Sequence, residues 1–312
     1  MPYNHQFIPG YRIPFPDITA SDNVPGSPLH YHHHSIVMNP DRRLAFYSAS
    51  NTDGRTWKPI ERKGGFKKDV QLDPEFQLGE ELYDSINAAS GRKNDFDEGH
   101  LTSFQEVLWG KKKDLTIAGA DTFFYTNCVP QHGSLNRGAW RSLEQYLLKK
   151  GADPNELKIA VMTGPVLLPD DPYFINVVDG NYIRIPCAFW KVIYYKGSRG
   201  LQAVGFMMSH LNLLLEAKTV TYQKGDVLDR SLAPEEDVFM MFPKATTYQV
   251  SVDFIQNITG MKFFTHGVVL PYQSSESREI IYKRVEVPVP RGMEEMQPEN
   301  GQVEFELGNI TI

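Results

Sequence analysis

The chain has 312 residues, of which 41% are hydrophobic and 22% are charged. This composition excludes a disordered chain and provides enough apolar residues for one large domain or two small ones. The formal net charge of −6 argues against a nucleic-acid-binding protein with a basic surface throughout. Two short basic clusters, at residues 62–68 and 110–113, fit either solvated loops or a local binding site for an anion.

The two cysteines, Cys128 and Cys187, lie in apolar, strand-like surroundings, which predicts two buried reduced thiols rather than a disulfide. No stretch approaches the roughly 18 apolar residues of a membrane span, so no membrane association is expected. The first residues lack the apolar core of a signal peptide. They favour a cytoplasmic protein as the chain is given, and a secreted one if a leader has been removed.

Residues 1–30 are rich in proline, glycine and aspartate and predict an extended arm with Phe7, Tyr11 and Phe15 as anchors. Two apolar runs at residues 35–38 and 44–49 flank a turn-forming Asn-Pro-Asp and predict a hairpin. The histidines at positions 30 and 32–34 suggest a metal site. The structural interpretation is preferred, because side chains alternate along a strand and at most two or three could converge.

Residues 51–93 predict an irregular loop long enough to be functional, and Arg55 and Trp57 are its most chemically interesting residues. A short strand is expected at residues 96–101, a short helix within 104–120, and a strand at 122–130. The clearest helix spans residues 136–150, because Trp140, Leu143 and Leu147 form its apolar face and Gly151 can end it.

The second half of the chain alternates strands with one further helix. Strands are expected at residues 157–168, 182–195 and 201–209, and a helix at 246–261 that ends at Gly260. We find no repeat, no low-complexity block and no linker, so we expect one domain. The predicted organisation is an N-terminal arm at 1–30, a catalytic domain at 31–270, and a C-terminal extension at 271–312 that packs on the domain or a partner.

The stretch of residues 94–144 carries groups that suit hydrolysis of a phosphodiester. That reaction needs a base to take a proton from water and a way to stabilise charge on the phosphoryl group. A neutral histidine such as His100 suits the base, because its ordinary pKa is near 6.5. Asn136 offers a carbonyl oxygen to a hard cation and Glu144 offers a carboxylate. Asn136 could instead act only as a helix cap.

The spacing of Asn136 and Glu144 constrains how they share an ion. Eight residues along a straight helix rotate two side chains by roughly 80° and separate them by about 12 Å. Both therefore cannot bind one ion directly. We expect Asn136 to be the ligand, with Glu144 reaching through water or contacting the substrate. Two neighbouring residues could also take part in the reaction. The apolar surroundings of Cys128 argue against a thiolate nucleophile, and a direct role for His132 is disfavoured.

Three segments in this stretch match the signature of a known family, which reads D-R-G-H, then T-N-x-x-P-Q, then N-x-x-x-W-x-x-L-E. The matching residues are Asp97-Glu98-Gly99-His100, Thr126-Asn127-Cys128-Val129-Pro130-Gln131, and Asn136 through Trp140 to Leu143-Glu144. The chain resembles the DNA/RNA non-specific endonuclease family, the ββα-metal or His-Me finger nucleases. The resemblance extends to Arg55 and to segments at 161–167, 185–195 and 250–260, and it covers residues 30–268.

The resemblance implies an α+β fold with a central, mainly antiparallel sheet flanked by helices and a ββα-metal motif at the active site. It implies Mg²⁺ as the cofactor, with Mn²⁺ or another divalent ion as alternatives. His100 would be the general base, Asn136 the protein ligand of the ion, and Glu144 would contact the ion through water. Asn127 would support the site and Arg55 would bind the phosphate. The remaining expected substrate contacts are Glu98, Gln131 and Arg141.

The substrate implied by the resemblance is DNA, with RNA left open, cleaved with little sequence preference to 5′-phosphate and 3′-hydroxyl ends. A homodimer is an expected partner, because relatives are often dimers. One position departs from the family: Glu98 stands where the signature has arginine. Another basic residue could replace that arginine, Glu98 could join the metal site, or activity could be weakened. The alternatives to an active nuclease are a nucleic-acid-binding protein and a phosphodiesterase for a smaller substrate.

Overall fold

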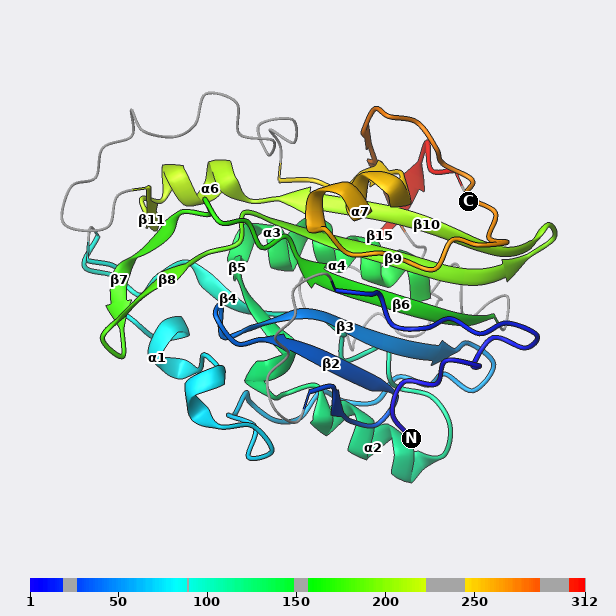
Figure 1. The fold of residues 1–312 in the computed structure, drawn as a ribbon, viewed down its shortest axis with the longest axis horizontal. Helices are drawn as coiled ribbons and strands as arrows, with labels where there is room; N and C mark the ends of the chain where they lie inside the picture. The colour runs from blue at the N-terminus through cyan, green and yellow to red at the C-terminus, as the bar shows by residue number, and fades with distance from the viewer. Residues whose placement is uncertain (19–26, 89, 149–156, 223–244, 287–302, 312) are drawn as a thin grey trace.

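The computed structural model describes residues 1–18, 27–88, 90–148, 157–222, 245–286 and 303–311. Its centre is an antiparallel sheet of eight strands in the order β1-β2-β3-β6-β9-β10-β12-β13 (Figure 1). The strands are β1 (Leu29–His30), β2 (His34–Asn39), β3 (Leu44–Asp53), β6 (Lys158–Pro165), β9 (Ala188–Gly197), β10 (Gly200–Ser209), β12 (Tyr248–Val250) and β13 (Arg278–Glu279).

Three smaller sheets surround the central one. A three-stranded sheet contains β11 (Val220–Thr221), β7 (Tyr173–Val178) and β8 (Asn181–Arg184), and hairpins pair β4 (Phe96–His100) with β5 (Cys128–His132) and β14 (Ile281–Glu286) with β15 (Val303–Gly308). The helical elements are η1 (Pro74–Phe76), α1 (Glu80–Tyr83), α2 (Lys112–Asp121), η2 (Tyr125–Asn127), α3 (Gly133–Leu135), η3 (Asn136–Trp140), α4 (Arg141–Tyr146), α6 (Leu211–Glu216) and α7 (Val252–Thr259). The predicted α+β class is confirmed.

Local sequence signals placed several elements correctly. The predicted hairpin is β2–β3, which pairs in antiparallel register with a bulge between Val37 and Met38. The short strand and short helix expected around residues 96–121 are β4 and α2. Gly260 ends α7 in a left-handed conformation with φ of 69°, which glycine adopts without steric cost.

Four predicted boundaries were wrong. The strand expected at 122–130 begins only at Cys128, because the three residues before it form the 3-10 helix η2. The strand expected at 182–195 is divided into β8 and β9 at Pro186, which has no N–H to donate to a ladder. The helix expected at 246–261 begins only at Val252, because residues before it pair with β10 as β12 and Ser251 Oγ caps the helix by accepting from Phe254 N at 3.1 Å. The helix expected at 136–150 begins at Gly133, and its proposed stop at Gly151 lies outside the described residues.

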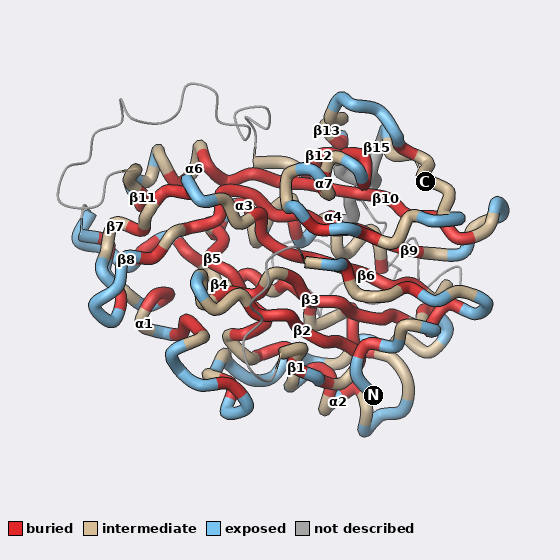
Figure 2. The backbone as a smooth tube through the Cα atoms, in the orientation of Figure 1, coloured by how far each residue is buried: buried red, intermediate tan, exposed pale blue. Residues whose placement is uncertain are grey.

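The two faces of the central sheet bury separate hydrophobic cores. On one face, strand residues pack with the N-terminal segment and α7; this core includes Tyr3, Ile8 and Ile255. On the other, they pack with α3, α4 and the β4–β5 hairpin, and this core includes Leu135 and Leu143. In Figure 1 the first layer lies in front of the sheet and the second behind it. The strands between them are buried along most of their length, and the exposed residues gather at hairpin tips and connections (Figure 2).

Both ends of the described chain pack against the domain. Residues 1–18 are mostly without regular structure but bury Tyr3, Phe7, Ile8 and Ile13. At the other end, Thr311 N donates to Gln249 Oε1 at 3.0 Å, and so ties the last described residues to β12. The boundaries at 30 and 270 stay predictions.

Candidate active site

The β4–β5 hairpin brings the histidine segment and the Thr-Asn-Cys-Val-Pro-Gln segment side by side. Its antiparallel register pairs His100 with Cys128 and Asp97 with Gln131. Gly99 is required here, because a Cβ atom at that position would lie 2.3 Å from Oε1 of Gln131. Gln131 is wholly buried and does not line the pocket described below, so its placement does not support the predicted substrate contact: it fills the space that Gly99 leaves open.

The helix that follows is not straight. A π-helical turn, η3, separates α3 from α4, and within it Gly138 has φ of −100° and ψ of −107°, outside the helical region. The lining residues of this helix recur every four positions: Asn136, Trp140 and Glu144, with Arg137, Arg141 and Gln145 beside them. A rotation of roughly 80° between Asn136 and Glu144 keeps both on one side of the helix. Both side chains therefore line one pocket at different depths along the helix.

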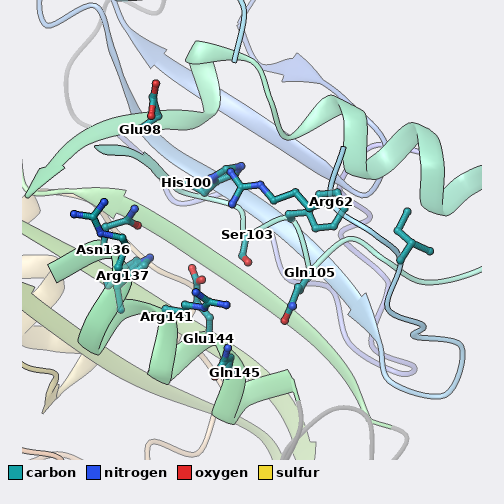
Figure 3. Close-up of a pocket in the computed structure, with 13 residues that line it drawn as sticks. Arg62, Glu98, His100, Ser103, Gln105, Asn136, Arg137, Arg141, Glu144 and Gln145 are labelled. Carbon is teal, nitrogen blue, oxygen red and sulfur yellow. The ribbon is translucent and has the colours of Figure 1, made fainter. Parts of the chain in front are cut away.

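The pocket has a volume of about 380 Å³ and two walls (Figure 3). One wall comes from the β4 strand and from loops at residues 60–62 and 103–105, and the other from the η3–α4 helix. The lining residues are Ile60, Arg62, Glu98, His100, Ser103, Phe104, Gln105, Asn136, Arg137, Trp140, Arg141, Glu144 and Gln145. The sequence-predicted residues His100, Glu98, Asn136, Arg141 and Glu144 are therefore brought together.

His100 is held between aromatic rings. Its ring lies 4.7 Å from the Phe66 ring and 5.5 Å from the Phe123 ring, measured between centroids. Nε2 is enclosed and has no hydrogen-bond partner among the described residues. Burial lowers the pKa of His100 to about 3, and the nearby Arg62 and His34 add to this effect. The imidazole is therefore neutral at physiological pH, as a general base must be.

Asp97 orients Asn136. Nδ2 of Asn136 donates to Oδ2 of Asp97 at 3.0 Å, and Nη1 of Arg137 lies 3.3 Å from the other carboxylate oxygen. An ionised carboxylate can only accept hydrogen bonds, so the amide nitrogen of Asn136 must face Asp97. The carbonyl oxygen of Asn136 is thereby left for another partner. Asp97 belongs to the recognised motif, but its role was not predicted from the sequence.

Glu144 is the carboxylate of the helical wall. Its Oε1 is enclosed and accepts no hydrogen bond from the described residues. Nζ of the buried Lys191 lies 3.8 Å from this oxygen. Burial raises the pKa of Glu144 to about 7; Lys191 opposes this shift and Glu106 adds to it. A cation placed beside this oxygen would favour the ionised carboxylate.

Asn127 lies behind the site. It is wholly buried, and its side chain closes a ring of hydrogen bonds around Thr102: Oδ1 accepts from Thr102 N at 3.0 Å and Nδ2 donates to Thr102 O at 2.9 Å. Nδ2 also donates to Thr122 O at 3.1 Å. Asn127 therefore fixes the chain two residues beyond His100. This agrees with a supporting role and gives it no contact with the pocket.

Arg55 does not reach the pocket. Its residue is exposed in the turn after β3, where its backbone N–H donates to Asp53 Oδ1 at 3.2 Å. Arg62 lines the pocket instead, with its guanidinium carbon 5.0 Å from the centre of the Phe123 ring. The phosphate contact predicted at Arg55 finds no support in this placement, and Arg62 is the arginine of this region that lines the pocket. The basic cluster at residues 62–68 was the sequence signal for it.

The oxygen donors fit a hard divalent cation. The carboxylate of Glu144 and the outward carbonyl oxygen of Asn136 are the ligand type that Mg²⁺ prefers, and Mg²⁺ needs few protein ligands because it keeps several waters. Among the described residues, no group of three or more His, Cys, Asp and Glu side chains is arranged to hold a metal. A soft or nitrogen-rich site of the zinc type is therefore not found in that part of the chain.

The other candidate residues have structural roles. His33 stacks on Trp109 with ring centroids 3.5 Å apart, and His34 stacks on Tyr31, which agrees with the structural interpretation of the histidine run. His132 caps α3 by accepting from Ser134 N at 3.2 Å. Both cysteines are free and buried, and burial raises the pKa of the Cys128 thiol. No helix within the described ranges has the length and apolar character needed to cross a membrane.

Comparison with known proteins gave related sequences. A family model described as DNA/RNA non-specific endonuclease matches residues 18–269. The uncharacterized protein y4fB of Sinorhizobium fredii is 34% identical over 278 residues, which are 84% of this chain and 38% of that protein. Human mitochondrial endonuclease G is 31% identical over 124 residues, or 38% of this chain and 39% of its own. Human mitochondrial nuclease EXOG is 27% identical over 210 residues, or 64% of this chain and 46% of its own.

The fold is also similar to a solved structure. A chain in the crystal structure of the EndoG/EndoGI complex superposes with a TM-score of 0.52 at 19% identity, covering 76% of this chain and 84% of that one. At this identity the likeness shows the fold alone. The large antiparallel sheet of the two proteins agrees. The matches cover less than half the length of each of the three curated relatives named above.

Proposed function

The chain belongs to the DNA/RNA non-specific endonuclease family, and on that premise we propose that it is a magnesium-dependent endonuclease. It hydrolyses phosphodiester bonds of DNA, and of RNA as a second substrate to be tested, with little sequence preference. The products carry 5′-phosphate and 3′-hydroxyl ends. The observation that carries the proposal is the convergence of a neutral His100, the carbonyl of Asn136 and the carboxylate of Glu144 on one pocket.

His100 acts as the general base. Because its pKa is lowered to about 3, its lone pair is available across the physiological pH range. Nε2 is enclosed by protein, so the proton of the attacking water is accepted at Nδ1. The rings of Phe66 and Phe123 fix the plane of the imidazole, and Asn127 fixes the backbone that follows it.

Asn136 would be the direct ligand of the divalent ion, and Glu144 would contact the ion through water. The family is typically magnesium-dependent. When bound, such an ion stabilises negative charge on the phosphoryl group and on the leaving oxygen. Asp97 keeps the amide nitrogen of Asn136 turned away, so the carbonyl oxygen stays in the pocket.

The phosphate is bound by arginine despite Glu98. The pocket is lined by three arginines, Arg62, Arg137 and Arg141, against the two carboxylates of Glu98 and Glu144. The lining therefore remains net positive when both glutamates are ionised. Among the explanations for Glu98, this favours replacement of the missing arginine by other basic residues. Arg62 suits the role best, because it lies close enough to depress the pKa of His100 and is supported by the Phe123 ring.

The direct test is digestion of plasmid DNA by wild type and His100→Ala, each with Mg²⁺ and with EDTA. We expect nicking and linearisation only by wild type with Mg²⁺, and loss of rate of about 10²- to 10⁴-fold in the variant, the usual contribution of a general base. His266→Ala is the matched control, because His266 is exposed and far from the motif in sequence. An intact plasmid with both wild type and His100→Ala contradicts the proposal.

Glu98 in the pocket lining supports a second candidate, a nucleic-acid-binding protein with lost catalysis. Gel-shift binding that persists without cleavage distinguishes it from the nuclease. Cleavage of small phosphodiesters but not of plasmid identifies instead a phosphodiesterase for a smaller substrate. RNA digestion under the same conditions decides whether both nucleic acids are substrates, and light scattering decides whether the protein is a homodimer.

A further inference from the structure

A lysine is buried in the centre of the molecule, directly behind the pocket. Lys191 belongs to the central strand β9, and its side chain is 0% exposed. Its Nζ lies 2.7 Å from Oε1 of Glu106 and 3.8 Å from Oε1 of Glu144. Lys191 and Glu106 do not line the pocket, whereas Glu144 does. The lysine therefore reaches Glu144 from the side of the sheet.

A buried ammonium needs a strong reason to be there. Removing such a group from water costs several kcal/mol even after relaxation, and the cost is recovered only by close pairing. In β9 the alternate residues Phe189 and Ile193, on the same face as Lys191, belong to the hydrophobic core. An apolar residue at position 191 would continue this pattern and make the same sheet. The fold does not require a charge at this position, so the charge of Lys191 acts on the neighbouring carboxylates.

Glu106 anchors the lysine to the sheet. Ser50 Oγ donates to Glu106 Oε2 at 3.2 Å, and Thr52 Oγ1 donates to the Glu106 carbonyl at 2.7 Å. Both donors belong to β3, two strands away from β9. The Nζ of Lys191 also lies 5.2 Å from the centre of the Trp140 ring, on the helix that carries Glu144. The ammonium is thus fixed from below by Glu106 and faces the helix above.

The two distances differ in kind. At 2.7 Å the ammonium donates a hydrogen bond to Glu106, whereas at 3.8 Å it attracts Glu144 without hydrogen-bonding to it. Lys191 consequently holds Oε1 of Glu144 by charge, and this oxygen is enclosed by protein. The other carboxylate oxygen is the one left for a ligand in the pocket that Glu144 lines.

We propose that Lys191, fixed by Glu106, is a positioning residue that holds the enclosed Oε1 of Glu144 from behind and so turns the other oxygen of this carboxylate toward the pocket. This inference rests on the proposed function, in which Glu144 helps to hold a divalent ion. Lys191 touches neither substrate nor ion. Its effect is transmitted entirely through Glu144, and Glu106 matters because it prevents the ammonium from closing onto Glu144.

The test uses the double variant Lys191→Met/Glu106→Gln. It removes one positive and one negative charge together, so the net charge near Glu144 does not change, and replacing both members of a buried pair is usually tolerated by the fold. Mg²⁺ affinity is measured by calorimetry without nucleic acid, and kcat and KM are measured with plasmid. We expect a loss of Mg²⁺ affinity of about 10- to 100-fold, the usual size for residues that orient a ligand, and a lower kcat with little change in KM.

The matched control is Arg42→Met/Asp171→Asn. This pair is also buried, with Nη2 of Arg42 2.7 Å from Oδ2 of Asp171, but it does not line the pocket. We expect it to lower the melting temperature without changing Mg²⁺ affinity. If Lys191→Met/Glu106→Gln binds Mg²⁺ as wild type does and keeps its kcat, Lys191 serves only to neutralise Glu106 and the inference is overturned.

A single variant guards against loss of folding in the double variant. Glu106→Gln keeps an acceptor for Lys191 but removes its balancing charge, so the ammonium is expected to move onto Glu144 and lower Mg²⁺ affinity at least about tenfold. Unchanged affinity in this variant also overturns the inference. A wild-type protein that binds Mg²⁺ but does not cleave contradicts only the proposed function. A wild-type protein that does not bind Mg²⁺ contradicts both.

Discussion

The two faces of the central sheet are built from the same strands but carry different chemistry. In the middle of β3, β6 and β9, the face toward the N-terminal segment carries Tyr47, Met162 and Trp190, all in one hydrophobic core. The face toward the pocket carries Ser48, Thr163 and Lys191, which the antiparallel register places in one row across the three strands. Alternation along each strand separates the two sets completely.

The two sets of side chains do different work: the apolar set stabilises the fold, and the polar set positions the segment beside the pocket. The apolar face holds the N-terminal segment and α7 by burial of side chains, which has no preferred direction. The polar face holds the segment that follows His100 by directed bonds: Ser48 Oγ lies 2.6 Å from Thr102 Oγ1, and Ser50 and Thr52 bind Glu106. Substitutions in the core of the first face should alter the free energy of unfolding. Substitutions in the polar row of the second face, which also buries a hydrophobic core of its own, should alter catalysis.

Acidification should produce the largest effect, and it acts on the pocket side. Burial lowers the pKa of His34 to about 4 and of His210 to about 3. Above pH 6.5 both histidines are neutral in the folded and the unfolded chain, so they do not change the free energy of unfolding there. Below it the unfolded chain takes up protons that the fold excludes, and the free energy of unfolding should fall by up to about 3 kcal/mol per pH unit from these two residues.

Denaturant titration between pH 7.5 and 5 measures this slope. His34→Gln removes one of the two groups, so it should remove about half of the pH dependence that these two histidines contribute to the free energy of unfolding. His266→Gln is the control variant on an exposed histidine. A wild-type free energy of unfolding that does not vary over this range would show that the histidines are accessible to protons in the folded state.

Met162→Ala tests the apolar face. Met162 is 1% exposed, and truncation of a buried methionine to alanine costs about 2–5 kcal/mol through lost burial and the cavity left behind. The melting temperature should fall, while kcat on plasmid, measured below the transition, should match wild type. Val70→Ala is the control for stability, because Val70 is 96% exposed. A large fall in kcat for Met162→Ala would show that the two faces are not independent.

Asp97→Ala tests positioning within the pocket. Without the carboxylate, the amide of Asn136 can rotate and present its nitrogen to the ion. We expect activity to fall about 10- to 100-fold with little change in melting temperature, and higher Mg²⁺ to recover part of the loss. Asp95→Ala is the neighbouring control, because Asp95 is exposed and does not line the pocket. Equal activities of the two variants would remove Asp97 from the site.

Glu98→Arg should have the smallest effect. It adds a cation to a lining that already holds three arginines, so KM for DNA should fall only a few-fold and the dependence of binding on salt should steepen by about one to two phosphate contacts. The measurement is KM at several salt concentrations, with Mg²⁺ affinity in parallel. Lower activity together with weaker Mg²⁺ binding would identify Glu98 as part of the metal site.

Local signals in the sequence predicted those parts of the fold that local physics decides. The β2–β3 hairpin follows from a turn-forming Asn-Pro-Asp between apolar runs, and the end of α7 from a glycine that can adopt positive φ. The motif residues His100, Asn136 and Glu144 were found because their types and spacing carry the chemistry. The division of the strand at Pro186 was also visible in the sequence and was missed.

What the sequence by itself determined is the set of groups that could take part in the reaction, because chemistry depends on residue type. Only the tertiary structure decided which of them meet. The pocket brings His100 of β4 together with Asn136 and Glu144 of the facing helix, loop packing places Arg62 rather than Arg55 beside His100, and the space over Gly99 buries Gln131. Lys191 became visible only when the sheet placed it behind Glu144, since the side a strand residue faces depends on partners far away in the chain.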